Sequence, residues 1–556
     1  MTELDDAITS RLAGWTTDRV AERLWAKDGS LWAASGKPAD EVAAWLGWLD
    51  LPAAMSARVA ELEHLARDVR EDGYRRAAVL GMGGSSLAPE LFSRVFGWAG
   101  GPAGNGAASA DGLELRILDS THPDVVRGFR SWASEQRTLF CVSSKSGSTA
   151  EPNAYQAAMG EIAPALDFVA ITDPGTSLAE LARAQEFRAI VEAPPDVGGR
   201  YSALTVFGLV PAALNGVDVR TLLERALLMA EACRTPDTAS NPGLSLGAAI
   251  GEAALAGRDK LTILTSPRMA AFGDWAEQLV AESTGKAGKG IVPVVGEPLA
   301  DPDAYGDDRY FLFVRFADEP DPAMSALANE EIVLDGPLDI GAEFMRWEVA
   351  TAAAGIVLGI DPFDQPNVQE SKDATKELLT AYQSTGALPA SMPLVSEPGI
   401  AVSADPAVLG DTPVSVEGAM HQLLGLTRGG RDYFGILAYL PPDRPIEERL
   451  QAIRGRIRDA TGAATTLGFG PRFLHSTGQL HKGGPDTGVF LQLTADPSKD
   501  LPIPGWEESF GTLIAAQALG DLASLQRRGR RALRLHFADA EAGVDRLDAM
   551  IGAYTR

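Results

Sequence analysis

Short apolar runs alternate with helix-length segments through the first half of the 556-residue chain, and this alternation constrains the fold more than any other feature. The runs at 76–80, 115–118, 139–142 and 167–171 have the length and composition of β-strands. Strands separated by helices predict a mainly parallel sheet that is covered on both faces. Loops at the carboxyl ends of its strands would then form the ligand site.

The second half of the chain carries runs of the same kind, at 261–265, 310–314, 434–440, 489–493 and 532–535. Single cores seldom grow beyond about 250–300 residues, so a chain of this length is expected to form at least two domains. A Gly-rich stretch at 97–112 is expected to be a flexible surface loop. The predicted parts are a helical N-terminal region at 1–73, a first α/β domain at 74–220, a helical connector at 221–257, and a second α/β domain with a C-terminal extension at 258–556.

The charge balance excludes several classes of partner. Lys and Arg number 49 against 75 Asp and Glu, which gives a net charge of −26. Such a chain is not expected to bind nucleic acid or an anionic membrane, and an anionic substrate would need a local positive pocket. Two cysteines, Cys141 and Cys233, suggest no disulfide framework. With no signal peptide and no apolar run of about 20 residues, a cytoplasmic location is expected.

A hydroxyl-rich loop follows the strand expected at 139–142. Unpaired backbone N–H groups and the helix dipole both favour an anion at a helix N-terminus, so a phosphate is the expected ligand of this loop. The simpler alternative is that these side chains only cap the next helix and shape the turn. The hydroxyl residues are Ser143, Ser144, Ser146, Ser148 and Thr149.

A second loop of the same design, at 81–86, follows the strand expected at 76–80. Its glycines let the backbone approach an anion closely, and Ser85 and Ser86 add hydroxyl groups. Ser86 stands where a dinucleotide fingerprint requires glycine, so a nucleotide ligand is not required. Both loops are expected at the same edge of the sheet.

Three further side chains are candidates for chemistry. Gly198 and Gly199 precede Arg200 and would let its guanidinium reach a crowded point, although a surface ion pair is the commoner role of an arginine. Gln278 and Glu282 are four residues apart and share one helix face, for which a solvated face is the simpler expectation. No cluster of His, Cys and carboxylate residues has metal-ligand spacing, so neither a metal nor another cofactor is expected.

Together these motifs resemble those of the phosphoglucose isomerase family, over most of the chain from about Val79. The chain is most similar to the isomerase half of bacterial transaldolase/phosphoglucose isomerase fusions, and no transaldolase portion is expected. The resemblance implies two sugar isomerase (SIS) αβα sandwiches with mainly parallel sheets and helical additions. The matching segments are 81–85, 144–151, 198–202, 278–286 and 363–372.

The resemblance implies interconversion of glucose 6-phosphate and fructose 6-phosphate through a cis-enediol, a step of glycolysis and gluconeogenesis. Glu282 is implied to be the base and Arg200 to stabilise the enediolate. His475, with Lys372, is implied to move protons during ring opening. The implied sugar-phosphate ligands are Gly84, Ser85, Ser144, Ser146, Thr149, Gln278 and Gln365.

The histidine departs from the family pattern. The family places its catalytic histidine between the glutamate and the lysine, whereas no His occurs here between Glu282 and Lys372. His475 is the nearest candidate, since geometry rather than chain order defines a site, and His481 is its main competitor. The remaining histidines are His64 and His421, expected to be structural, and His122 and His536, which match no motif.

The family also implies a homodimer with a shared active site. Two alternative functions are a bifunctional glucose/mannose-6-phosphate isomerase and a non-catalytic SIS-domain sensor of sugar phosphates. The presence of Glu282, Arg200 and Lys372 in their motifs speaks against the sensor. Five tryptophans in the first fifty residues are expected to pack against the body of the protein. They are Trp15, Trp25, Trp32, Trp45 and Trp48.

Overall fold

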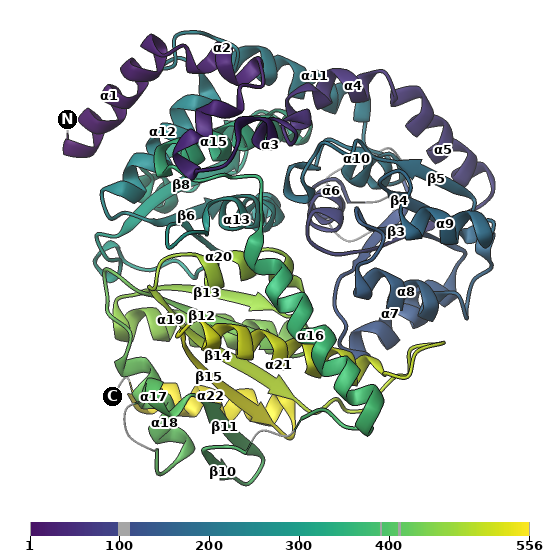
Figure 1. Cartoon of the computed structure of the whole chain (residues 1–556), viewed down its shortest axis with the longest axis vertical. Helices are drawn as coiled ribbons and strands as arrows, with labels where there is room; N and C mark the ends of the chain where they lie inside the picture. The colour runs from purple at the N-terminus through teal and green to yellow at the C-terminus, as the bar shows by residue number, and fades with distance from the viewer. Residues whose placement is uncertain (1, 98–111, 390–391, 410–412, 555–556) are drawn as a thin grey trace. The chain divides into compact units, whose positions relative to one another are not determined.

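A computed structural model describes residues 2–97, 112–389, 392–409 and 413–554. The loop predicted at 97–112 therefore lies almost wholly outside the described residues. The chain forms two compact units, each built from separate stretches, whose helices and strands are labelled in Figure 1. The first unit contains Met1–Asp119, Phe129–Thr284 and Tyr310–Asp364, and the second contains Ser120–Gly128, Gly285–Arg309 and Gln365–Arg556.

The first unit contains a five-stranded parallel sheet in the order β2-β1-β3-β4-β5. Its three central strands are buried along their whole length, and strands buried on both faces carry continuous apolar runs. Helices α6 (Leu87–Phe96), α8 (Ala150–Met159), α9 (Ser177–Ala184) and α10 (Val206–Leu214) contact it. The strands are β1 (Arg76–Gly81), β2 (Glu114–Leu118), β3 (Thr138–Ser143), β4 (Phe168–Thr172) and β5 (Ala189–Glu192).

A second sheet of the first unit places β6 (Lys260–Thr265), β8 (Arg309–Phe316) and β9 (Glu330–Leu334) side by side. In the same unit, α12 and α15 pack against each other. The two backbones lie so close that a Cβ built on Gly247 would be 2.5 Å from the Ala350 carbonyl oxygen. The helices of this part are α11 (Val219–Ala232), α12 (Pro242–Leu255), α13 (Ala270–Thr284), α14 (Pro322–Leu327) and α15 (Ile340–Leu358).

The N-terminal region is helical, as the sequence predicts. Thr2 starts the first helix with a capping box, in which its hydroxyl accepts the Asp5 N–H at 3.2 Å and Asp5 Oδ2 accepts the Thr2 N–H at 2.7 Å. The elements are α1 (Glu3–Thr17), α2 (Val20–Trp25), the 3₁₀ helix η1 (Gly29–Ser35), α3 (Ala39–Ala43), η2 (Gly47–Asp50), α4 (Leu51–Ser56) and α5 (Val59–Glu71).

The second unit is organised around a mixed sheet in the order β10-β11-β15-β14-β12-β13. Strand β11 runs antiparallel to both of its neighbours, and the other pairs are parallel. The strands are β10 (Val395–Glu397), β11 (Ile400–Ala404), β12 (Tyr433–Tyr439), β13 (Ala464–Phe469), β14 (Gly488–Ala495) and β15 (Arg531–Phe537). Its elements also include β7 (Val292–Val295), α16 (Pro366–Thr385), α18 (Val416–Gly425), α19 (Arg444–Thr461), α20 (Gly478–Gly483), α21 (Phe510–Arg527) and α22 (Ala540–Tyr554).

The predicted α/β class with mainly parallel sheets is confirmed, but the described residues form three sheets where the sequence predicts two sandwiches. The strands of 258–556 do not join into one sheet, because β10–β15 enclose a separate apolar core that includes Phe434, Leu491 and Leu533. The four-part division along the chain stays a prediction, since both compact units are discontinuous in sequence.

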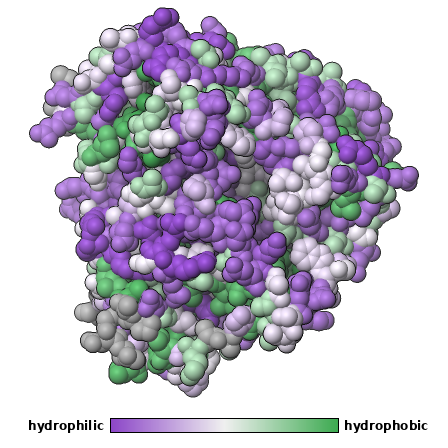
Figure 2. Space-filling view, viewed as in Figure 1, coloured by the Kyte–Doolittle hydropathy of each residue, from purple (hydrophilic) through white to green (hydrophobic). Residues whose placement is uncertain are grey.

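Figure 2 shows hydrophilic residues over most of the face in view. No helix in the described ranges combines the length and the apolar character that crossing a membrane requires.

Candidate functional site

The two predicted loops leave the same edge of the first sheet. In the β1–β3 pair Gly81 lies opposite Ser143, so both strands end at the same level and both loops begin there. This placement follows from parallel pairing and agrees with the expectation from the sequence.

The hydroxyl loop is not used to cap its helix. Thr149 occupies the N-cap position of α8 with an extended backbone, yet α8 receives no side-chain capping hydrogen bond. Instead Ser144 donates to Thr149 Oγ1 at 3.2 Å, and the hydroxyls of Ser146 and Ser148 lie 3.0 Å apart. Ser144 is buried and Ser146 is exposed. The capping alternative is therefore not supported, and the positive helix end remains available to an anion.

The glycine loop touches the segment that carries Arg200. A Cβ built on Gly84 would lie 1.9 Å from the carbonyl oxygen of Gly199, so no residue larger than glycine fits at position 84. Ser202 donates its hydroxyl to the Gly199 carbonyl at 2.6 Å. Ser85 beside Gly84 is buried. The close approach of the two backbones thus brings Arg200 to the sheet edge from which both loops leave.

Arg200 is 2% exposed, so the surface ion pair considered from the sequence is wrong for this residue. Its Nε donates to Ser283 Oγ at 2.7 Å, and its Nη2 donates to the carbonyl oxygens of Pro362 at 2.6 Å and Asp364 at 3.0 Å. Its Nη1 lies 3.3 Å from Glu282 Oε1. The guanidinium is thereby fixed in one orientation beside the carboxylate.

Gln278 and Glu282 lie on one face of α13, as their spacing predicts, but that face is buried and not solvated. Gln278 Nε2 donates to Glu282 Oε2 at 3.2 Å. The guanidinium on one oxygen and the amide on the other offset part of the cost of burying the carboxylate. Arg200, Gln278 and Glu282 thus form one polar cluster inside the first unit.

The other predicted residues belong to the second unit. Gln365 is exposed and directly precedes α16, on which Lys372 is also exposed. His475 is half-buried and ends the short helix η9 (Arg472–His475). Their participation in one site with the first unit's cluster stays a prediction.

His481, the competitor of His475, is enclosed by aromatic side chains. Its ring lies 4.9 Å from Phe490, 6.0 Å from Tyr433 and 6.2 Å from Phe473. Burial, with Lys482 and Arg530 nearby, holds the pKa of His481 well below its usual value. Its Nε2 has no hydrogen-bond partner among the residues that the structure describes. A neutral imidazole in this setting is poorly suited to proton transfer, which favours His475.

Sequence reasoning assigned no role to Gln479, which proves to be a buried hub of the second unit. Its Oε1 accepts the Asn367 N–H at 2.8 Å, while its Nε2 donates to Asn367 Oδ1 at 2.7 Å and to the Gly285 carbonyl at 2.9 Å. It therefore ties the start of α16 to the tract that begins at His475. The only sequence signal was its place in the motif 475–479.

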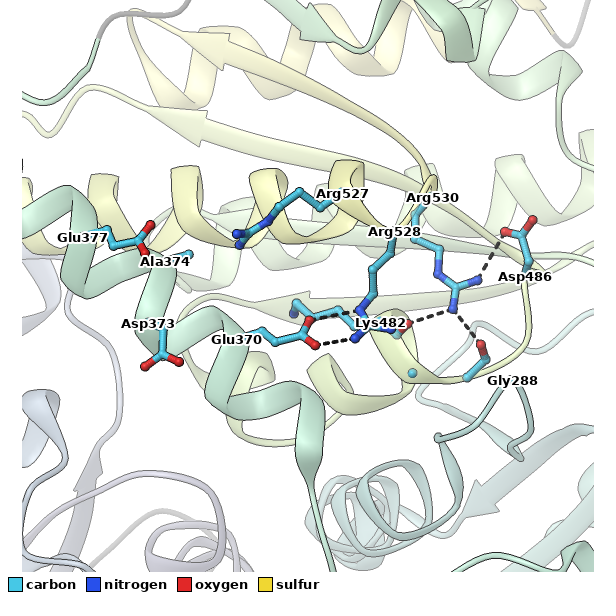
Figure 3. A pocket seen from close by; sticks show the side chains of 12 residues that line it. Gly288, Glu370, Asp373, Ala374, Glu377, Lys482, Asp486, Arg527, Arg528 and Arg530 are labelled. Carbon is cyan, nitrogen blue, oxygen red and sulfur yellow. Dashed lines mark hydrogen bonds and ion pairs between the residues drawn. The ribbon is translucent and has the colours of Figure 1, made fainter.

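A cavity of about 900 Å³ in the second unit contains none of the predicted residues (Figure 3). Arg528 pairs with Glu370, and Arg530 pairs with Asp486 at 3.3 Å while donating to the Gly484 carbonyl at 2.6 Å. The cavity thus lies at the C-terminal ends of α20 and α21, where cations are expected to satisfy carbonyl groups. Its lining charges balance: Glu370, Asp373, Glu377, Lys482, Asp486, Arg527, Arg528 and Arg530.

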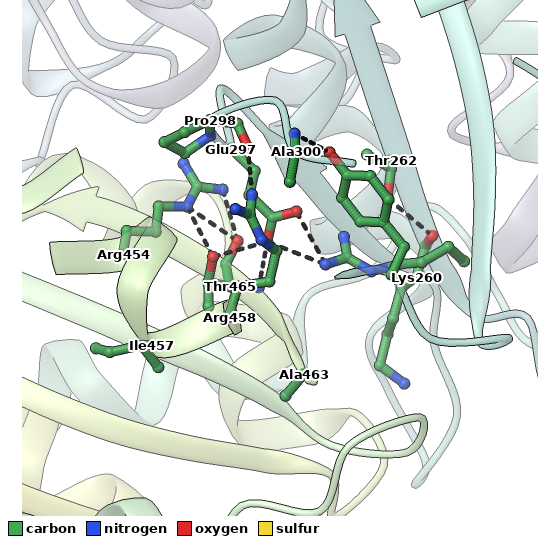
Figure 4. Close-up of polar contacts among 12 residues, drawn as sticks. Lys260, Thr262, Glu297, Pro298, Ala300, Arg454, Ile457, Arg458, Ala463 and Thr465 are labelled. Atoms are coloured by element: carbon green, nitrogen blue, oxygen red, sulfur yellow. Dashed lines mark hydrogen bonds and ion pairs between the residues drawn. The ribbon is translucent and has the colours of Figure 1, made fainter. Parts of the chain in front are cut away.

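The second unit also contains a buried ion cluster, which surrounds Glu297 (Figure 4). Its two oxygens lie 3.0 and 2.9 Å from Arg309 Nη2, and Oε1 also accepts from Thr465 N at 2.8 Å and Thr465 Oγ1 at 2.7 Å. Burial raises the pKa of Glu297, but Arg309 and Arg454 outweigh burial and hold the pKa below its ordinary value. Arg454 in turn binds the Thr465 carbonyl through Nη2 at 2.5 Å. This cluster fixes the segment that follows α13.

Metal ligation finds no support in the ranges that the structure covers, where no three His, Cys, Asp or Glu side chains gather in a way that could hold an ion.

Comparison with known proteins agrees with this picture. No protein-family model matches the chain. It is 28% identical over 389 residues to the glucose-6-phosphate isomerase of Rubrobacter xylanophilus, which covers 59% of this chain and 88% of that protein. It is also 28% identical over 410 residues to the glucose-6-phosphate isomerase of Carboxydothermus hydrogenoformans, with 60% and 85% covered.

Two solved structures share the fold. A hypothetical protein from Thermus thermophilus aligns with a TM-score of 0.51 and 23% identity, covering 66% of this chain and 98% of that chain. A glucose-6-phosphate isomerase from Chlamydia trachomatis aligns with a TM-score of 0.51 and 18% identity, covering 67% and 86%. At these identities the likeness is one of fold.

Proposed function

We propose that this chain, a sequence relative of glucose-6-phosphate isomerases, is an aldose-ketose isomerase that interconverts glucose 6-phosphate and fructose 6-phosphate through a cis-enediol. The observation that carries the proposal is the buried Arg200–Glu282–Gln278 cluster, which joins the sheet edge of the two anion loops through Gly84. A base and a fixed cation beside a phosphate cradle are the parts that such a proton transfer requires.

Glu282 acts as the base in this proposal. The reaction moves one proton between C1 and C2, so a single carboxylate that takes the proton from one carbon can return it to the other. The contacts of Glu282 with Gln278 and Arg200, at 3.2 and 3.3 Å, are long enough to exchange for a contact with substrate. Gln278 then orients the carboxylate of Glu282 and the bound sugar relative to each other.

Arg200 stabilises the negative charge of the enediolate. An arginine stays protonated at any working pH, and a fixed cation needs no reorganisation when the charge develops. The carbonyls of Pro362 and Asp364 and the hydroxyl of Ser283 supply that fixed position.

The two loops bind the phosphate. The uncapped N-terminus of α8, with Ser144, Ser146 and Thr149, supplies N–H and hydroxyl donors, and Ser85 with the amide of Gly84 adds a second set. On a chain of net charge −26, neutral donors and a helix dipole attract the anion locally. Binding energy from the remote phosphate then orients the reacting carbons.

His475 and Lys372 handle the protons of ring opening, and Gln365 orients the sugar. Resemblance supports these roles, and the enclosed environment of His481 supports the choice of His475. A homodimer with a shared active site and a cytoplasmic location are proposed on the same resemblance. Sedimentation of the purified protein tests the dimer.

Turnover of fructose 6-phosphate by the purified protein tests the proposal, with mannose 6-phosphate assayed in parallel. We expect Glu282→Gln to abolish turnover and Glu277→Gln, on the same helix, to retain it. A folded wild-type protein that binds fructose 6-phosphate without turning it over would reject the isomerase in favour of the sensor.

A further inference from the structure

Two segments of the first unit hold Arg200, and aromatic rings join them. The first segment carries Arg200 itself, and the second supplies the Pro362 and Asp364 carbonyls that accept from its guanidinium. Tyr201 follows Arg200, and Phe363 lies between the two residues of the second segment whose carbonyls accept. The Tyr201 and Phe363 rings lie 5.3 Å apart, so the two segments are packed directly against each other.

Trp48, from the N-terminal region, completes this contact. Its ring lies 5.2 Å from Tyr201 and 6.4 Å from Phe363, and it is fully buried. Trp32 meets Phe363 in a T-shaped arrangement at 5.1 Å, and its Nε1 donates to the Ala352 carbonyl at 2.9 Å. The rings of Trp32, Phe363, Trp48 and Tyr201 thus form one aromatic cluster beside the arginine.

Backbone contacts join the same N-terminal stretch to the chain just before Gly198. Leu46 pairs with Val197 in an antiparallel bridge, and the Gly47 N–H donates to the Asp196 carbonyl at 3.2 Å. A Cβ on Gly47 would lie 2.3 Å from the Asp196 carboxyl group, so a larger residue at position 47 would displace that side chain. These contacts fix the backbone around Gly47, which places Trp48 against Tyr201.

We infer that Trp48 is a positioning residue for the isomerase reaction, acting through Tyr201 and Phe363 on the carbonyls that orient Arg200. The inference rests on the proposed function. The indole N–H of Trp48 has no hydrogen-bond partner in the described part of the chain, so its effect comes from ring contact alone. A displacement of about 1 Å at a catalytic group can cost roughly 100-fold in rate, and a smaller ring at position 48 leaves Tyr201 and Phe363 free to shift.

Kinetics of Trp48→Phe provide the first test, with Trp15→Phe as the matched control. Trp15 is a buried tryptophan of the same region. We expect Trp48→Phe to lower kcat by about 10- to 100-fold while KM for fructose 6-phosphate changes less than about threefold, because no ring of the aromatic cluster belongs to either phosphate loop. We expect Trp15→Phe to keep kcat. A residue that only packs the core would lower Tm and leave the kcat of the folded protein unchanged, and that outcome would overturn the inference.

Binding of two unreactive ligands gives a readout that does not depend on turnover. A five-carbon aldonate phosphate carries a carboxylate where the enediolate forms, whereas an alditol phosphate is uncharged there. We expect the wild type to bind the aldonate phosphate more tightly than the alditol phosphate, because the fixed Arg200 guanidinium favours the carboxylate. We expect Trp48→Phe to lose at least about tenfold of that preference in affinity. Equal preference in wild type and variant would overturn the inference.

Phe363→Leu serves the same comparison if Trp48→Phe does not fold, and it should lose the same preference. A wild type that neither turns over fructose 6-phosphate nor prefers the aldonate phosphate would reject the proposed function itself. Intact wild-type turnover with an unaffected Trp48→Phe would reject only the inference about Trp48.

Discussion

Glu282 in the first unit and Glu297 in the second are both buried carboxylates paired with arginine, yet their surroundings differ. Glu297 is held at 2.7–3.0 Å by Arg309 and Thr465, and its side chain is 2% exposed. Glu282 meets its partners at 3.2–3.3 Å, and its side chain is 11% exposed. Tight contacts lock a carboxylate into the structure, whereas longer ones leave it free to accept a proton.

Glu282→Gln carries the largest expected effect. Removing a general base costs about 100- to 10,000-fold in rate, and we expect a loss of at least about 1,000-fold in kcat. Glutamine keeps the contact with Gln278, and Arg200 keeps its contacts with Ser283 and two carbonyl groups, so we expect the free energy of unfolding to fall less than in Glu297→Gln. Steady-state kinetics and calorimetry on one preparation measure both. Retained activity with lost stability would make Glu282 a structural residue like Glu297.

Glu297→Gln should show the opposite pattern. Removing one partner of a buried ion pair costs about 3–5 kcal/mol, because Arg309 is left without its counter-charge. We expect the free energy of unfolding to fall by about 3 kcal/mol while kcat of the remaining folded protein stays near wild type. Urea titration reports the first quantity. A variant with full stability and lost turnover would contradict the assignment.

The low pKa of Glu297 also predicts an acid dependence. A carboxyl group whose folded pKa lies below its unfolded value stabilises the protein above that unfolded value and loses the contribution as pH falls. The stability difference between wild type and Glu297→Gln should therefore shrink as the pH is lowered below about 4. A difference that stays constant from about pH 7 to about pH 3 would mean that Glu297 is not charged in the folded state.

Gln479→Ala tests whether a neutral hub can matter as much as an ion pair. The substitution leaves the Asn367 amide and the Gly285 carbonyl without their buried partner, which costs about 1–3 kcal/mol. We expect Tm to fall and kcat to drop with it, because the start of α16 loses its tie to the His475 tract. Gln369→Ala, an exposed position of α16, serves as the control, and equal Tm for both variants would refute the hub.

Glu343 extends the comparison to a carboxyl group whose pKa is set mainly by burial. Burial raises its pKa from 4.5 to about 7, against the opposing effect of Arg346. A raised folded pKa stabilises the protein below pH 4.5, and that stabilisation is lost as pH rises to about 7. Glu343→Gln should therefore gain stability relative to wild type between about pH 5 and about pH 8, by about 2 kcal/mol. Thermal melts at the two pH values measure this, and a pH-independent difference would contradict it.

The sequence predicts strands well where an apolar run stands out from its surroundings and poorly where the strand is short or its apolar run is broken. All nine predicted runs are strands, including the wholly buried β1 and β3. The strands that it misses include β5 and β9, whose half-exposed positions break the apolar run, and β7, which is buried but only four residues long. Burial against a second layer is a tertiary property that a short window of sequence does not contain.

The candidate site divides in the same way. Motifs place the loops near Ser144 and Gly84 because strand ends and glycine turns are local signals. Burial of Glu282 beside Arg200 depends on contacts between distant segments, and spacing alone favoured a solvated face for it. Trp48 illustrates the limit, since its tryptophan-rich surroundings predict packing but not the partner, Tyr201.

The discontinuous course of the first unit has a consequence for synthesis on the ribosome. The carbonyl partners of Arg200 at Pro362 and Asp364 lie 162 and 164 residues further along the chain. A nascent chain that has reached only Thr284 contains Glu282 and Arg200 but lacks β8 and both carbonyls. At about 5–20 residues per second, several seconds therefore pass between the synthesis of Arg200 and the synthesis of its carbonyl partners. During part of that time β6 has an unpaired strand edge. The β6 edge stays unpaired on that side until β8, which ends at Phe316, has emerged, and Arg200 lacks its second carbonyl partner until residue 364 has emerged.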